Sequence, residues 1–196
     1  MDRVGDAVMR RSWSLLVWLL AATPAAQQAS PTCQFQDGMV DHALQRNATA
    51  SPFSLQEASN AIDGDDRTRW ESGHSRCGTK ECFEQYIEVD LGSMQTLCAV
   101  SILWHSAFAS LYELQTSRDG ATWTTVRTVD DSFSSGTHFT TSGLPIGTTA
   151  HYLRVYCLQR ALHPKYGYSI FTLQILGAAA PSQTKRSRPR ARKSRC

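Results

Sequence analysis

The feature that most constrains the fold is an alternation of apolar and polar residues through most of the chain after Cys82. In the segment 84–92, for example, Ile87, Val89 and Leu91 occupy every second position. Side chains of a β-strand point alternately to its two faces, so a period of two predicts strands with one buried face. After the first thirty residues, no segment has the sustained apolar spacing of an amphipathic helix. The chain is therefore predicted to be all-β.

Several further runs are rich in the β-branched and aromatic residues that favour strands. These runs are 96–104, 112–117, 121–129, 151–160 and 168–177. Arg118-Asp-Gly120 separates two of them and predicts a hairpin, because glycine readily adopts a positive φ. In the run 96–104, Cys98, Val100, Ile102 and Trp104 fall on one face. Short strands divided by turn signals predict an antiparallel β-sandwich.

The N-terminus has the three parts of a secretory signal peptide. Arginines precede the apolar run SLLVWLLAA, and a small-residue cleavage region follows near Ala26. The apolar run is about ten residues long, too short to span a bilayer. We therefore expect a signal peptide at 1–26 and a linker at 27–42, and a protein that is secreted or held at the cell surface. An uncleaved anchor is the alternative.

The C-terminal residues 178–196 are basic and contain no acidic residue, whereas acidic residues outnumber basic ones in the remaining mature chain. The tail has too few apolar residues to offset its chain entropy, and disorder is predicted. A basic tail attracts polyanions. In a secreted chain, anionic glycans or a cell wall fit this charge, and no nucleic acid is expected. A solvated tail without a partner is the alternative.

The six cysteines are typical of an oxidising compartment. Cys77 and Cys82 are close enough for a local disulfide. Cys98 and Cys157 lie on strand-like runs, where they either bridge strands or remain buried thiols. Six cysteines allow fifteen pairings, so connectivity stays open. Their spacing does not fit a zinc site. The sequon at Asn47 predicts surface glycosylation of that residue.

Motifs of common enzymes are absent from the sequence. It contains no G-x-S-x-G elbow, no H-E-x-x-H helix, no P-loop and no dinucleotide fingerprint. Its six histidines are scattered singly. The sequence therefore predicts a protein that is not an enzyme.

The stretch ASNAIDGDDRTRW (58–70) places three aspartates around one glycine. It does not fit an EF-hand, since Arg67, Thr68 and His74 fall at positions that need an oxygen ligand, a glycine and a glutamate. A tight turn can still direct carboxylate, hydroxyl and carbonyl oxygens towards Ca²⁺. An Asp-Gly turn without a metal is the alternative.

Five segments occur here in the order found in a discoidin domain, also called the coagulation-factor-five/eight type C domain. The segments are NAIDGDDRTRWES, QYIEVDLG, YELQTSRDGATWTTV, YLRVYCLQR and YGYSIFTLQILG. The resemblance covers about residues 43–177 and is nearest to the family-32 carbohydrate-binding modules of secreted glycoside hydrolases. It implies a jelly-roll β-sandwich with ligand-binding loops at one end.

The resemblance also implies a structural calcium ion held by the acidic loop. By position, its ligands are the Asn60 and Asp65 carbonyls, the Asp63 carboxylate and both oxygens of Thr68. The family completes this set from the last strand, at positions occupied here by Phe171 and Thr172. The second position is usually acidic, so one charged ligand is missing and weaker calcium binding is expected.

A lectin-like function is the main hypothesis, with glycans or a cell-wall or extracellular-matrix polysaccharide as partners. An adhesion module that binds a protein ligand or an anionic membrane is the alternative. Only Phe108 and the Ala-Leu pair 161–162 offer apolar loop tips for a membrane, so membrane binding is not favoured. Many relatives have glutamate where this chain has His105, which argues against an amino-sugar preference. The candidate sugar-binding residues are Arg69, Glu71, His74, Arg76, Trp104, His105, Arg160, His163 and Tyr166.

Overall fold

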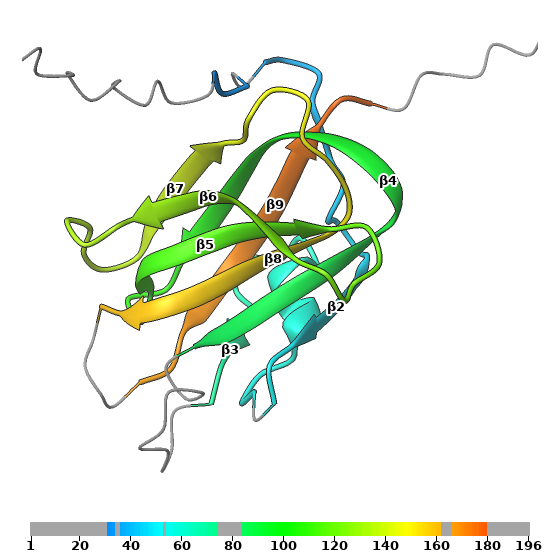
Figure 1. Ribbon diagram of the computed structural model, residues 1–196. Helices are drawn as coiled ribbons and strands as arrows, with labels where there is room; N and C mark the ends of the chain where they lie inside the picture. The colour runs from blue at the N-terminus through cyan, green and yellow to red at the C-terminus, as the bar shows by residue number, and fades with distance from the viewer. Residues whose placement is uncertain (1–30, 34–35, 53, 74–83, 162–165, 180–196) are drawn as a thin grey trace, which may run out of the picture.

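The computed structural model describes residues 31–33, 36–52, 54–73, 84–161 and 166–179, which form a two-layered antiparallel β-sandwich (Figure 1). The all-β prediction is confirmed, and the regular helical structure within these ranges is a single 3₁₀ turn. No helix in the described chain is long and apolar enough to cross a membrane. The elements are β1 (Val40–Asp41), β2 (Asn47–Ala50), η1 (Ala58–Ala61), β3 (Trp70–Glu71), β4 (Gln85–Trp104), β5 (Ala109–Ser117), β6 (Thr124–Asp130), β7 (His138–Gly143), β8 (Thr149–Arg160) and β9 (Ser169–Gly177).

Strand β4 belongs to both layers. Its first part pairs with β2 and β8, and β8 continues through β5 to β6. Its second part pairs with β7 and β9, and β9 also pairs with the short β1 and β3. The sequence pattern predicts two separate strands, 84–92 and 96–104, but the structure forms one strand with an irregular register between Asp90 and Gln95. Gly92, with φ +78°, lies in this bend.

Alternation within the strands builds the core between the layers. In β4, Ile87, Val89 and Leu91 are fully buried, while the intervening residues are partly exposed. The run 96–104 is buried on the face predicted from the sequence. Burying one such aliphatic side chain stabilises the fold by roughly 1.5–3 kcal/mol. The Arg118-Asp-Gly120 hairpin between β5 and β6 is also confirmed, with Gly120 at φ +72°.

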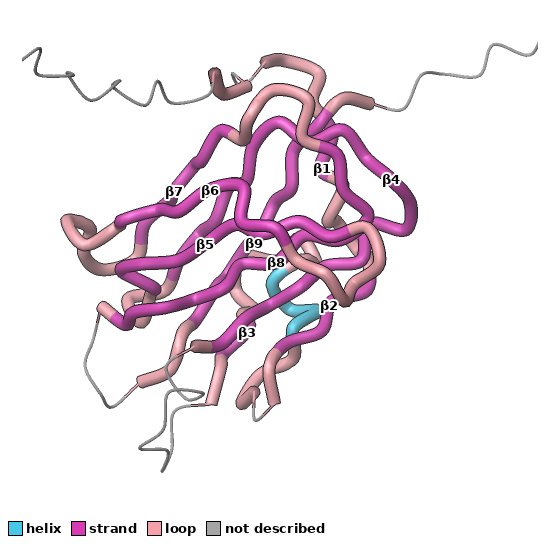
Figure 2. The backbone as a smooth tube through the Cα atoms, in the orientation of Figure 1, coloured by secondary structure: helices cyan, strands magenta, loops and turns pink. Residues whose placement is uncertain are grey.

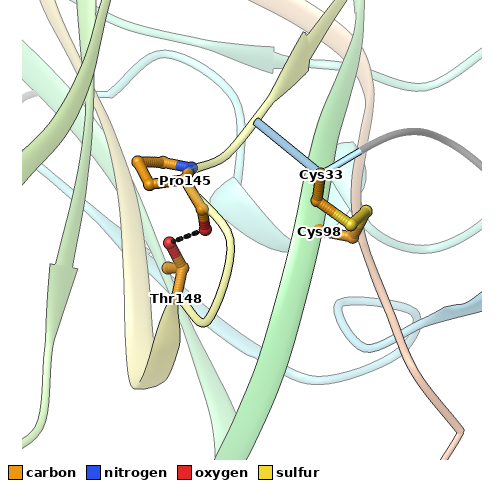
Figure 3. Close-up of a disulfide and its surroundings, with 4 residues drawn as sticks. All are labelled: Cys33, Cys98, Pro145 and Thr148. Atoms are coloured by element: carbon orange, nitrogen blue, oxygen red, sulfur yellow. Dashed lines mark hydrogen bonds between the residues drawn. A yellow bond between two sulfur atoms is a disulfide. The ribbon is translucent and has the colours of Figure 1, made fainter. Parts of the chain in front are cut away.

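A disulfide joins Cys33 to Cys98, with 5.1 Å between their Cα atoms (Figure 3). The sequence left Cys98 open between a disulfide and a buried thiol, and the structure shows it in a disulfide with Cys33. Cys157 is a buried free thiol on β8, and burial raises its pKa. Its inclusion among the disulfide candidates is therefore wrong. The other two candidates, Cys77 and Cys82, lie outside the described residues.

The segment predicted as a linker is partly built into the sandwich. The Cys33 amide donates to the Leu144 carbonyl, and Thr32 forms a β-bridge with Pro145. Strand β1 adds to β9, and the Asp41 carboxylate accepts the amides of Ala43 and Ile175 at 2.9 and 3.0 Å. The linker prediction is therefore wrong for these residues, because backbone pairing fixes short polar segments that have no clear strand pattern.

The sandwich has two distinct ends (Figure 2). We call one the disulfide end. It contains Cys33 and Cys98, the bend in β4 and the turn between β7 and β8, where the Thr148 hydroxyl donates to the Pro145 carbonyl at 2.7 Å (Figure 3). We call the other the loop end. It comprises the described residues 60–73, 105–108, 131–137, 160–161 and 166–172.

Candidate functional site

The acidic loop folds around Asp63 and Gly64. Gly64 adopts φ +87°, and the Asp63 Oδ1 atom accepts the Asp65 amide at 2.8 Å. The Thr68 amide donates to the Asp65 carbonyl at 3.1 Å and closes the turn. Local hydrogen bonds of this kind are typical of Asp-Gly sequences. Local hydrogen bonds therefore define the shape of the turn.

Three oxygens of this loop surround the Thr68 hydroxyl. The Asn60 carbonyl lies 3.1 Å from Thr68 Oγ1, the Asp63 Oδ2 atom 2.8 Å, and the Asp65 carbonyl 2.9 Å. A hydroxyl has one hydrogen to donate, so it can satisfy one acceptor at a time. Four oxygens thus converge with a single hydrogen among them, which is an arrangement suited to a hard cation. The structure brings together the four ligand residues predicted from this loop.

The three aspartates of the loop differ in their contacts. Asp65 forms a two-fold ion pair with Arg67, with both oxygen–nitrogen distances at 2.8 Å. This contact and the Arg67 amide lower the pKa of Asp65 to about 2. Its side chain is thus occupied with Arg67, while its carbonyl points to Thr68. Asp63 contributes its carboxylate to the oxygen cluster.

Asp66 connects the loop to the last strand. The Thr172 hydroxyl on β9 donates to the Asp66 carboxylate, across 106 residues of sequence. The Asp66 side chain is thus held by β9 although it lies in an exposed loop. Phe171 and Thr172 are both partly exposed, so β9 presents this position beside the loop. No group of three His, Cys, Asp or Glu side chains gathers as a metal site in the described chain. Any cation here therefore depends on carbonyl and hydroxyl oxygens as well.

Arg69, Glu71 and His105 form one polar group beside the loop. The Arg69 guanidinium donates to Glu71 Oε2 at 2.7 Å, and both side chains keep contact with solvent. Burial and the Arg69 charge lower the pKa of His105 below its ordinary 6.5, against an opposing effect of Glu71. The structure thus brings three predicted sugar-binding residues together. Their guanidinium, carboxylate and imidazole groups offer donors and acceptors to a polar ligand.

The residues 105–108 are held firmly by backbone hydrogen bonds to neighbouring segments. The His105 amide donates to the Ser169 carbonyl, and the Ser169 amide donates to the Ala107 carbonyl. The His105 ring also lies edge-on to the Phe171 ring, with 5.5 Å between centroids. Phe171 therefore contacts His105 through its ring, next to Thr172, which contacts Asp66 of the acidic loop.

The structure corrects two aromatic assignments. Trp104 is fully buried and packs against Tyr112, so it cannot offer a ring face to a sugar. Phe108 is 3% exposed, so it is not an apolar loop tip for a membrane. Trp70 is also fully buried in the core, with its indole donating to Ser54 at 3.1 Å. Trp104 shares a strand face with the buried residues Cys98, Val100 and Ile102, and this alternation in the sequence indicates that Trp104 also belongs to the core.

Arg160 and Tyr166 lie at the other side of the loop end. Arg160 is half-buried near the Tyr168 ring, and Tyr166 is 46% exposed. Arg160 and Ser106 line an open pocket of about 410 Å³, together with Phe108, Ser110, Ser132, Ser134, Ser135, Gly136, Gln159 and Ala161. Many of these residues carry hydroxyl groups.

Phe133 is a feature that the sequence analysis missed. Its side chain is 98% exposed in the turn between β6 and β7, among the serines of the pocket. An aromatic residue inside a Ser/Gly-rich turn was the available signal. Three other predicted sugar-binding residues, His74, Arg76 and His163, lie outside the described residues. Asn47 is exposed on β2, and its glycosylation stays a prediction.

An antiparallel sandwich with its polar loops gathered at one end is the architecture of a discoidin-like binding module. The chain belongs to the F5/8 type C domain family, whose pattern matches residues 46–170. No protein of curated function matches this chain.

Solved structures of carbohydrate-binding modules share the fold. Chitosan-binding module 1 of a chitosanase/glucanase from Paenibacillus sp. IK-5 is 35% identical, with a TM-score of 0.60 over 70% of this chain and 99% of that one. Module 2 of the same enzyme, in complex with chitotriose, is 29% identical, with a TM-score of 0.55 over 69% and 98%. The family 32 module of NanJ from C. perfringens, in complex with galactose, is 19% identical and shows a similar fold, with a TM-score of 0.58 over 71% and 98%.

Proposed function

We propose that this chain is a secreted, non-catalytic carbohydrate-binding module with a structural calcium ion next to its glycan site. The observation that carries the proposal is the grouping of Arg69, Glu71 and His105 on a firmly held loop end. Membership of the F5/8 type C family and the similarity to chitosan-binding modules support the same function. We propose that the chain binds the glycan and does not catalyse its cleavage.

The loop end suits the polar side of a sugar. The Arg69 guanidinium can donate to neighbouring hydroxyls, and Glu71 can accept from a hydroxyl or an ammonium group. The ion pair between them holds both groups in place before a ligand arrives, which reduces the entropy lost on binding. Tyr166, which is 46% exposed, offers an aromatic face for the C–H surface of a sugar ring.

Calcium is proposed at the oxygen cluster around Thr68. The Asn60 and Asp65 carbonyls, the Asp63 carboxylate and the oxygens of Thr68 would hold it, completed by Phe171 and Thr172 of β9. Asp66 makes up for the acidic residue that Thr172 replaces, because its carboxylate already meets the Thr172 hydroxyl. A bound cation would fix the loop against β9, and through Phe171 it would steady His105.

A glycan array tests the function. The wild type is applied with calcium and with a chelator, to chito-oligosaccharides, galactose-ended oligosaccharides and uronic-acid oligomers. We expect binding to one sugar class, weakened by the chelator. The double variant Arg69→Ala/Glu71→Ala should lose it, while Asp37→Asn, an exposed acid at the disulfide end, should bind as the wild type does.

The adhesion alternative gives a different result in a parallel measurement. Vesicles containing phosphatidylserine are offered to the same protein samples. Binding to these vesicles without binding to any glycan would overturn the carbohydrate function in favour of a membrane module. Phe133 would then be the first residue to change, since this apolar side chain is 98% exposed at the loop end.

A further inference from the structure

The outward face of the first layer carries a second group of aromatic and charged residues, remote from the acidic loop. On β4, Tyr86 and Glu88 alternate with buried residues and point outwards. On β8, Arg154 and Tyr156 do the same. Tyr86 is directly opposite Tyr156, and Glu88 is opposite Arg154. These residues therefore lie on one surface, across strands that run side by side in Figure 1.

Aromatic rings on this surface surround the Arg154 guanidinium. Its central carbon lies 4.2 Å from the Trp123 ring centroid, 5.0 Å from that of Tyr156 and 5.3 Å from that of Tyr86. The two tyrosine rings are stacked, with 6.4 Å between centroids and 21° between planes. Arg154 Nε donates to Gln115 Oε1 at 2.5 Å. The guanidinium is thus fixed, and the three partly exposed rings are arranged around it.

Carboxylates outnumber the one arginine on this face. Glu88 accepts the Thr49 hydroxyl at 3.0 Å, and Glu113 accepts the Thr125 hydroxyl at 2.8 Å. These donors are neutral, and the positive charge close to both carboxylates is that of Arg154. Glu84, at the start of β4, accepts the Tyr156 hydroxyl at 2.9 Å. The surface therefore combines immobilised aromatic rings with an excess of negative charge.

We propose that this aromatic-acidic face, made of Tyr86, Glu88, Glu113, Trp123, Arg154 and Tyr156, binds a polymer of cationic amino sugars. Aromatic rings contact the C–H faces of sugar rings, and carboxylates attract ammonium groups. Charge complementarity selects a cationic chain over neutral or anionic polysaccharides. Adjacent strands are about 4.8 Å apart, so the face from β4 to β5 spans roughly 10 Å. A polymer that crosses this face makes contacts that a single sugar at the loop end does not.

The inference deepens the proposed function and rests on it, but it concerns a different surface. The two surfaces can be told apart by ligand length. Chitotriose is a short probe for the loop end, and soluble chitosan is a polymer that can also cover the face. The acetylated polymer chitin presents similar sugar rings without most of the ammonium groups.

The decisive variant is Glu88→Gln/Glu113→Gln, tested for chitosan binding by depletion and for chitotriose binding by calorimetry. Loss of two ion pairs should weaken chitosan binding by about tenfold and reduce its salt dependence, with chitotriose affinity unchanged. Trp123→Ala should weaken chitosan binding as well. The control Asp37→Asn/Glu57→Gln removes the same charge from exposed positions off the face and should bind as the wild type does. Melting curves of all variants confirm that they fold.

The outcomes separate this inference from the proposed function. Equal chitosan affinity in the wild type and in Glu88→Gln/Glu113→Gln would overturn the aromatic-acidic face and leave the loop end standing. Another outcome combines two results: the wild type binds chitosan but no short glycan, and the variant does not bind chitosan. This outcome would support the face and overturn the loop end. A wild type that binds neither chitosan nor any short glycan would overturn both. Equal binding of chitin and chitosan would contradict the role of charge.

Discussion

The two ends of the sandwich are held together in different ways. At the disulfide end, a covalent bond joins Cys33 to Cys98, and main-chain hydrogen bonds fix the neighbouring turn. At the loop end, oxygens of residues 60–68 crowd around one hydroxyl, and Asp66 reaches Thr172 of β9. A covalent link constrains the unfolded chain under all oxidising conditions. An arrangement of acceptor oxygens gains its full stability when a cation binds.

This contrast separates stability from recognition. The disulfide end sets the baseline stability of the fold and should be insensitive to calcium. The loop end should respond to calcium and carry the glycan site. Variants at the disulfide end should therefore leave calcium and glycan binding unchanged, and variants at the loop end should leave the baseline stability unchanged.

The largest effect is expected from removing the disulfide. The double variant Cys33→Ser/Cys98→Ser should lose about 2–4 kcal/mol of unfolding free energy, because the unfolded chain regains the entropy that the cross-link removes. Chemical denaturation measures this loss. The calcium-induced rise in melting temperature should persist in the variant. A variant that lost its calcium response would contradict the independence of the two ends.

An intermediate effect is expected at the acidic loop, graded over its three aspartates. Asp63→Asn should abolish the rise in melting temperature on adding calcium, because Asp63 supplies the charged ligand of the cluster. Asp66→Asn should reduce the rise. Asp65→Asn is the matched control and should retain it, since the Asp65 side chain pairs with Arg67 and only its carbonyl joins the cluster.

Differential scanning fluorimetry with calcium, magnesium and chelator measures this series. A wild type whose melting temperature is the same in calcium and in chelator would refute the calcium site. A loss of response in Asp65→Asn equal to that in Asp63→Asn would refute the ligand assignment.

The smallest effect concerns the pH dependence at Asp41 on β1, whose partner strand β9 pairs with Leu97, next to Cys98 of the disulfide end. Burial raises the pKa of Asp41, against opposing hydrogen bonds from Ile175 and Ala43. The folded state therefore binds the proton more tightly than the unfolded chain, so the stability supplied by this group falls as pH rises through the raised pKa. Asp41→Asn keeps Oδ1, the one oxygen that accepts both amides, and removes the charge. It should melt slightly higher than the wild type at pH 7 and show no such advantage at pH 3.

Melting curves at the two pH values test this prediction. The calcium response of Asp41→Asn should equal that of the wild type, because the Asp41 carboxylate bonds to the Ala43 and Ile175 amides and not to the oxygens around Thr68. A variant less stable than the wild type at pH 7 would show that the ionised carboxylate contributes to the fold.

The sequence predicted most of the fold because strand periodicity is a local property. The alternation in 84–92 and 96–104 located β4 and its buried face, and the turn at Gly120 located a hairpin. The sequence pattern could not show that β4 continues through Gly92, since a glycine with positive φ can bend a strand as well as end it. The Cys33–Cys98 pairing was also out of reach, because it depends on which segments the complete fold brings together.

The site was less predictable because its contacts are long-range. Residues 60–68 form a local turn, so their grouping could be anticipated. The contact between Asp66 and Thr172 joins positions far apart in the sequence, and no local pattern indicates it. Trp104 was misassigned because its place at a strand end near polar residues outweighed the alternation that put it in the core. Arg69, Glu71 and His105 are three of the predicted sugar-binding residues that lie together in the structure, and their role in glycan binding stays a prediction.

The central claim, that the loop end binds the glycan, is tested most directly by NMR titration. Isotope-labelled protein is titrated with the short oligosaccharide that gives the strongest array signal, in saturating calcium. We predict that amide shifts will concentrate at Arg69, Glu71, His105 and Tyr166, and that the residues around Cys33 and Cys98 will remain unchanged. Shifts concentrated at the disulfide end, or no shifts at the loop end while the ligand binds, would contradict the account.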